Sequence, residues 1–195
     1  MSNGPTIFLS ASVPIPARDR AYFESADVIA IRDAIRALTM VVIERRALLI
    51  FGGHPAITPM IRLQIGDTGM SVRERFVVFQ SRYFEHVFPQ DNAAFEDVRL
   101  VDAVPGDREK SLLRMRQEML RNRFHCGLFI GGMEGVEQEY AMFRRAFGDT
   151  PTFPIASTGA AAARLFDRDE TLKRNHPELR DEISYLTLMR NLTKH

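Results

Sequence analysis

One local pattern occurs twice in this 195-residue chain: a short apolar run ends in two consecutive glycines, and a helical pattern begins at once after them. The two instances are residues 47–53 and residues 126–132. Apolar runs of this length are typical of buried strands. Glycines at such a turn permit positive φ and let a ligand approach the backbone, while the free N–H groups at the helix start favour an anion. The repeated pattern therefore predicts two loops that converge on one phosphate- or nucleotide-binding site, with Gly132 against the ligand.

A plainer interpretation of the glycine pairs stays open, because any parallel α/β protein needs glycine in some of its strand-to-helix turns. The rest of the chain continues the same alternation of apolar runs and helical patterns. Strands are predicted at residues 6–10, 47–51, 75–81, 98–101, 126–130 and 151–156, and helices at residues 26–46, 57–65, 111–123, after the second glycine pair through Phe147, and at 157–165. The aromatic stretch 83–94 is irregular and is expected to cover the sheet edge or the site.

Alternating strands and helices of this kind predict an α/β fold, Rossmann-like, with a mostly parallel sheet flanked by helices. We expect a single domain over residues 1–195, with a core at about 6–165 and a helical tail at 171–195. The broad apolar band of helix 26–46 suggests in addition that part of its surface packs on another subunit, although a thick domain can bury both sides of such a helix.

Charge and composition exclude several classes of protein. Lys and Arg number 26 against 25 for Asp and Glu, so the net charge of +1 predicts neither a nucleic-acid-binding nor a membrane-binding surface. No window approaches the ~18 apolar residues of a membrane span, and we expect a cytoplasmic protein. The single cysteine, Cys126, cannot form an internal disulfide, and its apolar surroundings predict a buried side chain. No metal site and no required cofactor are predicted.

Candidate ligand contacts follow from the rule that open parallel sheets bind ligands at the carboxyl ends of their strands. The candidates are Ser10, Ala11, Ser12, Gly52, Gly53, His54, Thr58, Ser81, Arg114, Gly131, Gly132, Met133, Glu134, Gly135, Glu139, Thr158 and Gly159. Arg114 is the arginine of helix 111–123 that we expect to turn inward, since a phosphate site usually needs a charged donor. His54 can contact a phosphate, act as an acid or base, or simply be polar surface. The hydroxyls at Ser10, Ser12 and Thr158 can equally serve turns and caps.

Two common nucleotide-binding motifs are missing. No Gly-x-Gly-x-x-Gly follows the first predicted strand, and no Walker lysine is present. Standard dinucleotide oxidoreductases and P-loop proteins are therefore poor matches.

At its two glycine loops the chain resembles the SLOG superfamily, which joins the Smf/DprA proteins with the Lonely Guy proteins. Lonely Guy enzymes carry Pro-Gly-Gly-x-Gly-Thr-x-x-Glu. Residues 130–139 match this motif at the glycines and at Glu139, but lack its proline and threonine and have one extra residue before Gly135. Segments 8–12, 51–55, 129–135 and 157–159 together resemble the bacterial SLOG domains associated with nucleotide signalling and antiphage systems.

The resemblance implies a Rossmann-like fold and a nucleotide-type ligand. It favours a sensor of an NAD-derived or other nucleotide signal, such as a cyclic ADP-ribose derivative, in a homo-oligomer (dimer or tetramer) that acts through a separate effector protein. The alternative is a nucleotide N-glycoside hydrolase in which Glu134 or Glu139 is catalytic, and the missing proline and threonine weaken the phosphoribohydrolase form of it. A module that has lost ligand binding is a third possibility, against which the intact glycine loops argue.

Overall fold

The computed structural model describes residues 4–17, 20–66 and 74–194. Six strands form one sheet in the order β4-β3-β2-β1-β5-β6, and every neighbouring pair is parallel. The strands are β1 (Thr6–Ser12), β2 (Leu48–Gly52), β3 (Phe76–Ser81), β4 (Asp97–Val101), β5 (Cys126–Gly131) and β6 (Thr152–Ile155). The predicted α/β, Rossmann-like fold is therefore confirmed, and the weakest predicted strand, β4, lies at an edge of the sheet.

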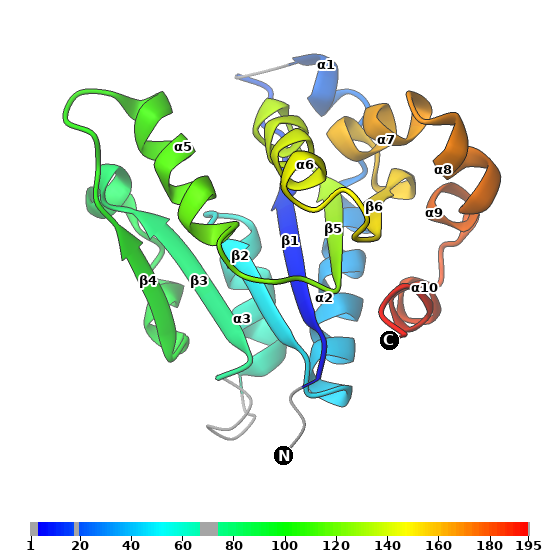
Figure 1. Ribbon diagram of the computed structural model, residues 1–195, viewed down its shortest axis with the longest axis horizontal. Coiled ribbons are helices and arrows are strands. Elements are labelled where there is room, and N and C mark those ends of the chain that lie inside the picture. The colour runs from blue at the N-terminus through cyan, green and yellow to red at the C-terminus, as the bar shows by residue number, and fades with distance from the viewer. Residues whose placement is uncertain (1–3, 18–19, 67–73, 195) are drawn as a thin grey trace.

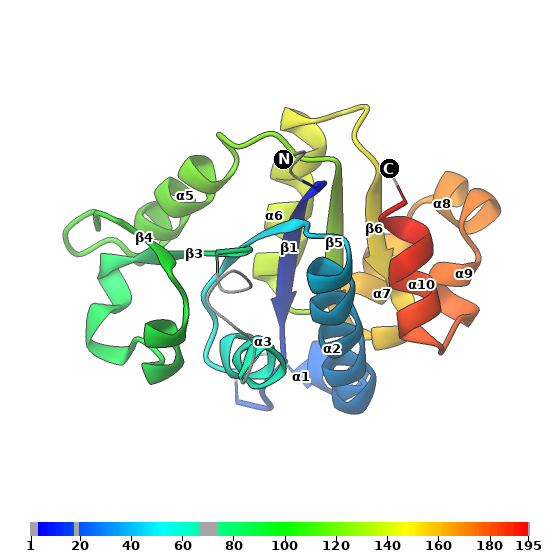
Figure 2. The same ribbon diagram turned by 90° about the horizontal axis from the view of Figure 1, so that it is seen from below.

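Helices cover both faces of the sheet (Figures 1 and 2). One face carries α2 (Val28–Glu44), α3 (Ile57–Ile65) and α10 (Tyr185–Leu192), and the other carries α5 (Arg108–Met119) and α6 (Glu134–Ala146). The remaining elements are α1 (Arg20–Phe23), η1 (Arg82–Val87), η2 (Gln90–Ala94), η3 (Ala156–Thr158), α7 (Ala160–Asp167), α8 (Glu170–Asn175) and α9 (Glu178–Asp181). No helix in the described parts of the chain is long and apolar enough to cross a membrane.

Strands β1, β2, β3 and β5 bury side chains on both faces, as a sheet covered by two helical layers requires. Along β1, Ile7 and Leu9 belong to the core under α2, whereas Phe8 belongs to the core under α5 and α6. There the Phe8 ring lies 4.9 Å from that of Phe143 on α6, centroid to centroid. Cys126 is buried at the start of β5, as predicted, and burial raises the pKa of its thiol to about 12.

The broad apolar band of α2 has an explanation within the chain. The helix packs against the sheet, α3 and α10 at once, so most of its apolar side chains are buried. Its exposed large apolar side chains are Ile29 (64% exposed) and Val28 (44%) in the first turn, and Met40 (38%) further along the helix. The band therefore does not by itself require another subunit.

Candidate functional site

A cavity of about 550 Å³ opens at the carboxyl edge of the sheet, where β1, β2 and β3 end. Chain order reverses beside β1, since the chain moves from β1 to β2 on one side and β5 lies on the other. Parallel sheets bind ligands at such a switch point. Nine of the predicted residues line this cavity: Ser10, Ala11, Ser12, Gly52, Gly53, His54, Met133, Gly135 and Glu139.

Helix α5 forms one wall of the cavity through a single stripe of side chains. The stripe consists of Arg108, Leu112, Met115 and Arg116. Leu112 lies four residues after Arg108, and Met115 and Arg116 lie three and four residues after Leu112; such spacings place side chains on one face of a helix. Asp107 begins the helix, because its side chain accepts a hydrogen bond from the Lys110 N–H at 2.9 Å. The wall is thus apolar in its middle and cationic at both ends.

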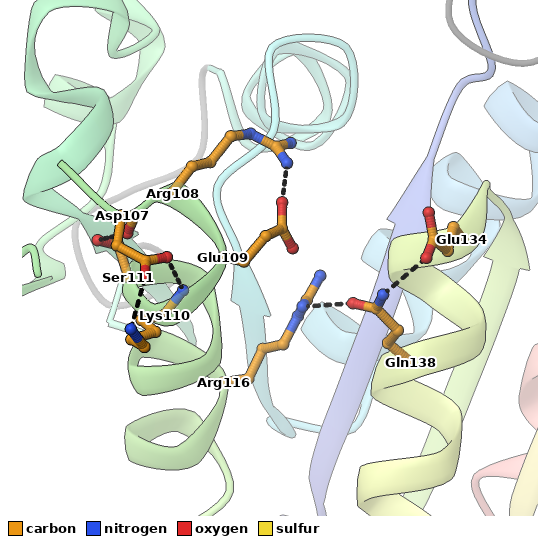
Figure 3. A network of polar contacts seen from close by, with 8 residues as sticks. All are labelled: Asp107, Arg108, Glu109, Lys110, Ser111, Arg116, Glu134 and Gln138. Carbon is orange, nitrogen blue, oxygen red and sulfur yellow. Dashed lines mark hydrogen bonds and ion pairs between the residues drawn. The ribbon is translucent and has the colours of Figure 1, made fainter.

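Arg116, at the buried end of the stripe, connects α5 to α6 through hydrogen bonds (Figure 3). Its Nε donates to Glu139 Oε1 at 3.1 Å and its Nη1 to Gln138 Oε1 at 2.8 Å. Gln138 in turn donates to Glu134 Oε1 at 3.1 Å. The side chains of Arg116 and Glu139 are only 8% and 15% exposed, so solvent screens this ion pair little.

Gly135 allows Arg116 to lie close to the first turn of α6, because a Cβ at this position would lie 3.1 Å from Arg116 Nη2. The N-cap residue of α6 is Met133, and no side chain of the described residues makes a capping hydrogen bond there. The cavity therefore meets a guanidinium and an uncapped helix N-terminus at the same place, and both favour an anionic group.

The Ser10 hydroxyl faces this region from β1. Ser10 lines the cavity, is 2% exposed, and its Oγ has no hydrogen-bond partner among the described residues. A buried polar group without a partner costs roughly 1–3 kcal/mol. A ligand that offers a hydrogen bond to Ser10 would remove this cost.

Gly131 and Gly132, the glycine pair at the end of β5, do not line the cavity. Gly131 and Gly132 have φ values of +56° and +93°, so they turn the chain from β5 into α6. A Cβ at Gly131 would lie 2.7 Å from Ile31 Cγ1, and one at Gly132 would lie 2.6 Å from Val136 Cβ. Gly132 is therefore not part of the cavity wall, and its missing side chain makes room for Val136 of α6; its contact with a ligand stays a prediction.

The third predicted strand-to-helix junction, at residues 157–159, makes a hydrogen bond to the loop that contains Gly131 and Gly132. The Thr158 hydroxyl accepts a hydrogen bond from the Gly131 N–H at 2.8 Å and donates to the Ile155 carbonyl at 2.6 Å. Gly159 has φ of +72°, and a Cβ there would clash with the backbone of Ser25. Thr158 and Gly159 thus lie outside the cavity wall.

Three other candidates also lie outside the wall. Thr58 is buried and accepts a hydrogen bond from the His54 N–H at 2.9 Å. Ser81 caps η1 by accepting from the Tyr83 N–H at 3.4 Å, and Glu134 holds Gln138. His54 itself lines the cavity, and its Nδ1 accepts from the Ala56 N–H at 3.1 Å. In the neutral ring the proton is therefore on Nε2.

Arg114 does not turn inward. It is exposed and lines a separate hollow between α5 and β4, together with Arg99 and Arg121. Residues two apart point to different sides of a helix, so the inward arginine is Arg116. The sequence could have identified Arg116, because it lies four residues after Leu112 and three before Met119, on the same helix face as these apolar residues.

Sequence reasoning also missed Arg108, Gln80 and the apolar end of the cavity. The Arg108 guanidinium pairs with Glu109 and lies 5.9 Å from the Phe84 ring centroid. The predicted helix began at residue 111, which left Arg108 outside it. The irregular stretch 83–94, expected to cover the sheet edge or the site, contributes Phe84, Val87, Phe88 and Pro89 to the cavity wall.

Comparison with known proteins gives a family and a fold. The model of the SLOG cluster3 family matches residues 21–193. Among solved structures, the X-ray structure of TM1055, a structural genomics target, superposes with a TM-score of 0.54 at 15% identity and covers 84% of this chain and 81% of that one. At this identity the likeness supports the fold alone. No curated protein matches the chain.

Proposed function

The chain belongs to the SLOG cluster3 family, and on that premise we propose that the cavity at the carboxyl edge of its sheet binds a nucleotide or nucleotide-derived ligand. One observation carries the proposal: the buried Ser10 hydroxyl, without a hydrogen-bond partner among the described residues, lines the cavity that the uncapped start of α6 and Arg116 also reach. A phosphate would lie at this end, where dipole and guanidinium act on the same group.

The neighbouring groups suit a ribose. Glu139 lines the cavity beside Arg116, and a carboxylate in a Rossmann-like site accepts hydrogen bonds from ribose hydroxyls. Its charge is balanced by Arg116, so a neutral sugar does not leave it buried without a partner. The apolar wall formed by Leu112, Phe84 and Phe88 would cover the remaining part of the ligand.

We propose further that the protein is a sensor, which binds its ligand and does not convert it. The signal would be NAD-derived or another nucleotide, such as a cyclic ADP-ribose derivative, in a bacterial defence or signalling system. The sensor would be a homo-oligomer, dimer or tetramer, that acts on a separate effector protein. Light scattering with and without ligand tests this assembly, and a monomer mass in both conditions would contradict it.

The ligand is tested by thermal shift over AMP, ADP-ribose, cyclic ADP-ribose, NAD and cyclic dinucleotides, with chromatography of each mixture afterwards. A binding protein is expected to be stabilised by at least one nucleotide that is recovered intact. Ser10→Ala should weaken that stabilisation. If no nucleotide raises the melting temperature, the proposal fails.

A second candidate function is supported by the position of Glu139. In hydrolysis of a nucleotide N-glycosidic bond, positive charge develops on the ribose as the base leaves, and a carboxylate in the cavity can stabilise it or activate water. Glu139→Gln keeps the oxygen that accepts from Arg116 but removes the charge. An enzyme that uses Glu139 should slow by about 100-fold or more. Base release at equal rates in both proteins would exclude Glu139 as catalytic, and a sensor releases no base in either.

A further inference from the structure

We propose that the carboxamide of Gln80 binds the hydrogen-bonding edge of the ligand's base, at the end of the cavity opposite α6. The inference rests on the proposed function and specifies how the ligand is oriented. Gln80 is 4% exposed, yet it lines the cavity from the end of β3. A buried amide at a cavity wall offers both a donor and an acceptor, which is the combination that the edge of a nucleobase requires.

The position of Gln80 fits the length of a nucleotide. From β5 and α6 to β3 the sheet order crosses β1 and β2, which amounts to three strand spacings, or about 14 Å. A nucleoside monophosphate with its base extended away from the phosphate has this span. With the phosphate at the start of α6, its base would therefore lie beside Gln80.

The carboxamide is held in place from two sides. The register that pairs Gly52 with Phe79 places Gly53 beside Gln80, and a Cβ on Gly53 would lie 2.5 Å from Gln80 Cδ. On its other side, Gln80 Nε2 donates to Asn92 Oδ1 at 3.3 Å. No described residue makes a hydrogen bond to Gln80 Oε1. The second N–H and Oε1 thus remain for a ligand, and the glycine is what lets the amide lie there.

The cavity that Gln80 lines also has an apolar wall suited to a flat ring. Phe84 and Phe88 line the cavity after β3, and Leu112 and Met115 line it from α5. The buried cation of the cavity, Arg116, lies instead at the α6 end. Apolar faces together with one oriented amide are the usual composition of a pocket for a heteroaromatic ring.

The test compares two probes that differ only in the base: AMP and ribose 5-phosphate, each titrated calorimetrically into wild type and variants. Gln80→Leu should lower the affinity for AMP about tenfold, the equivalent of one lost hydrogen bond to a buried group. It should leave ribose 5-phosphate unchanged. Gly53→Ala should act in the same way, because its Cβ displaces the flexible end of Gln80 while Gly53 has no positive φ. Gln117→Leu, an exposed glutamine on the opposite side of α5, is the matched control and should bind both probes as wild type does.

Three results would overturn the inference. Equal losses for both probes would mean that Gln80 supports the cavity and does not contact the base. Unchanged affinity for AMP in both variants would place the base elsewhere, with nucleotide binding intact. Wild type that binds neither probe would refute this inference, whereas the proposed function fails only if none of the screened nucleotides stabilises the protein.

Discussion

The loop after β2 and the loop after β5 contain the same glycine pair at the same edge of the sheet, but their glycines meet different neighbours. Gly52 and Gly53 line the cavity and have no positive φ. Gly131 and Gly132 have positive φ and fit against side chains of the core and of α6. One pair keeps space open for a ligand and for Gln80, while the other turns the chain into α6.

This difference separates two reasons for glycine that look identical in a sequence. A glycine that keeps space open can be replaced with loss of binding and little loss of stability. A glycine with positive φ in a packed turn cannot be replaced without strain. Substitutions in matched pairs therefore test whether the two glycine pairs have these different roles.

The largest effect is expected from valine in the second loop. Gly132→Val puts a β-branched residue at φ of +93° and against Val136, and should lower the free energy of unfolding by roughly 4 kcal/mol. Gly52→Val should lower it by no more than about 1 kcal/mol, because the nearest atom to its Cβ is the mobile Met115 Cε at 3.4 Å. Denaturant unfolding measures both. Equal losses for the two variants would remove the distinction.

The next effect concerns the helix that the second loop begins. Arg116→Gln removes the cation that pairs with Glu139, while the Glu139 carboxylate stays largely buried. The substitution should lower the free energy of unfolding by about 3 kcal/mol. Arg114→Gln, on the solvent side of α5, the helix that also carries Arg116, should change the free energy of unfolding by less than about 0.5 kcal/mol and leave AMP affinity unaltered. A larger loss in the Arg114 variant would contradict the assignment of Arg116 as the inward arginine.

A smaller effect separates two buried hydroxyls. Thr158→Val removes the acceptor of the Gly131 N–H and should cost about 1–2 kcal/mol of stability. Ser10→Ala removes a hydroxyl without a partner among the described residues, so stability should stay the same or rise slightly, while AMP affinity falls about five- to tenfold. Thermal unfolding and calorimetry check the two properties. A destabilised Ser10→Ala protein would show that this hydroxyl serves the fold.

The six strands, their mostly parallel pairing and the sheet edge that carries the cavity could be predicted from the sequence, because apolar runs and glycine turns are local signals. The roles of individual glycines could not. Whether Gly53 faces a ligand depends on Gln80, and whether Gly131 is replaceable depends on Ile31, and both neighbours lie far away in the chain.

That Arg116 faces inward and Arg114 does not could have been predicted from the sequence. Leu112, Met115 and Met119 define the inward face of α5, and Arg116 lies on it. A phosphate site alone does not say which of several arginines is nearest, whereas helical phase does. Gln80 carried no such signal, since its orientation depends on Asn92 and on the register between β2 and β3.

The most direct test of the nucleotide site is a calorimetric titration of AMP into Gly52→Val and into wild type. The titration is done at a temperature at which unfolding curves show both proteins to be folded. The added methyl groups would occupy the cavity between β2 and Met115 without straining the backbone. We predict that wild type binds AMP and that the folded variant shows no measurable heat of binding. A folded Gly52→Val protein that binds AMP with wild-type affinity would contradict the assignment of this cavity as the site.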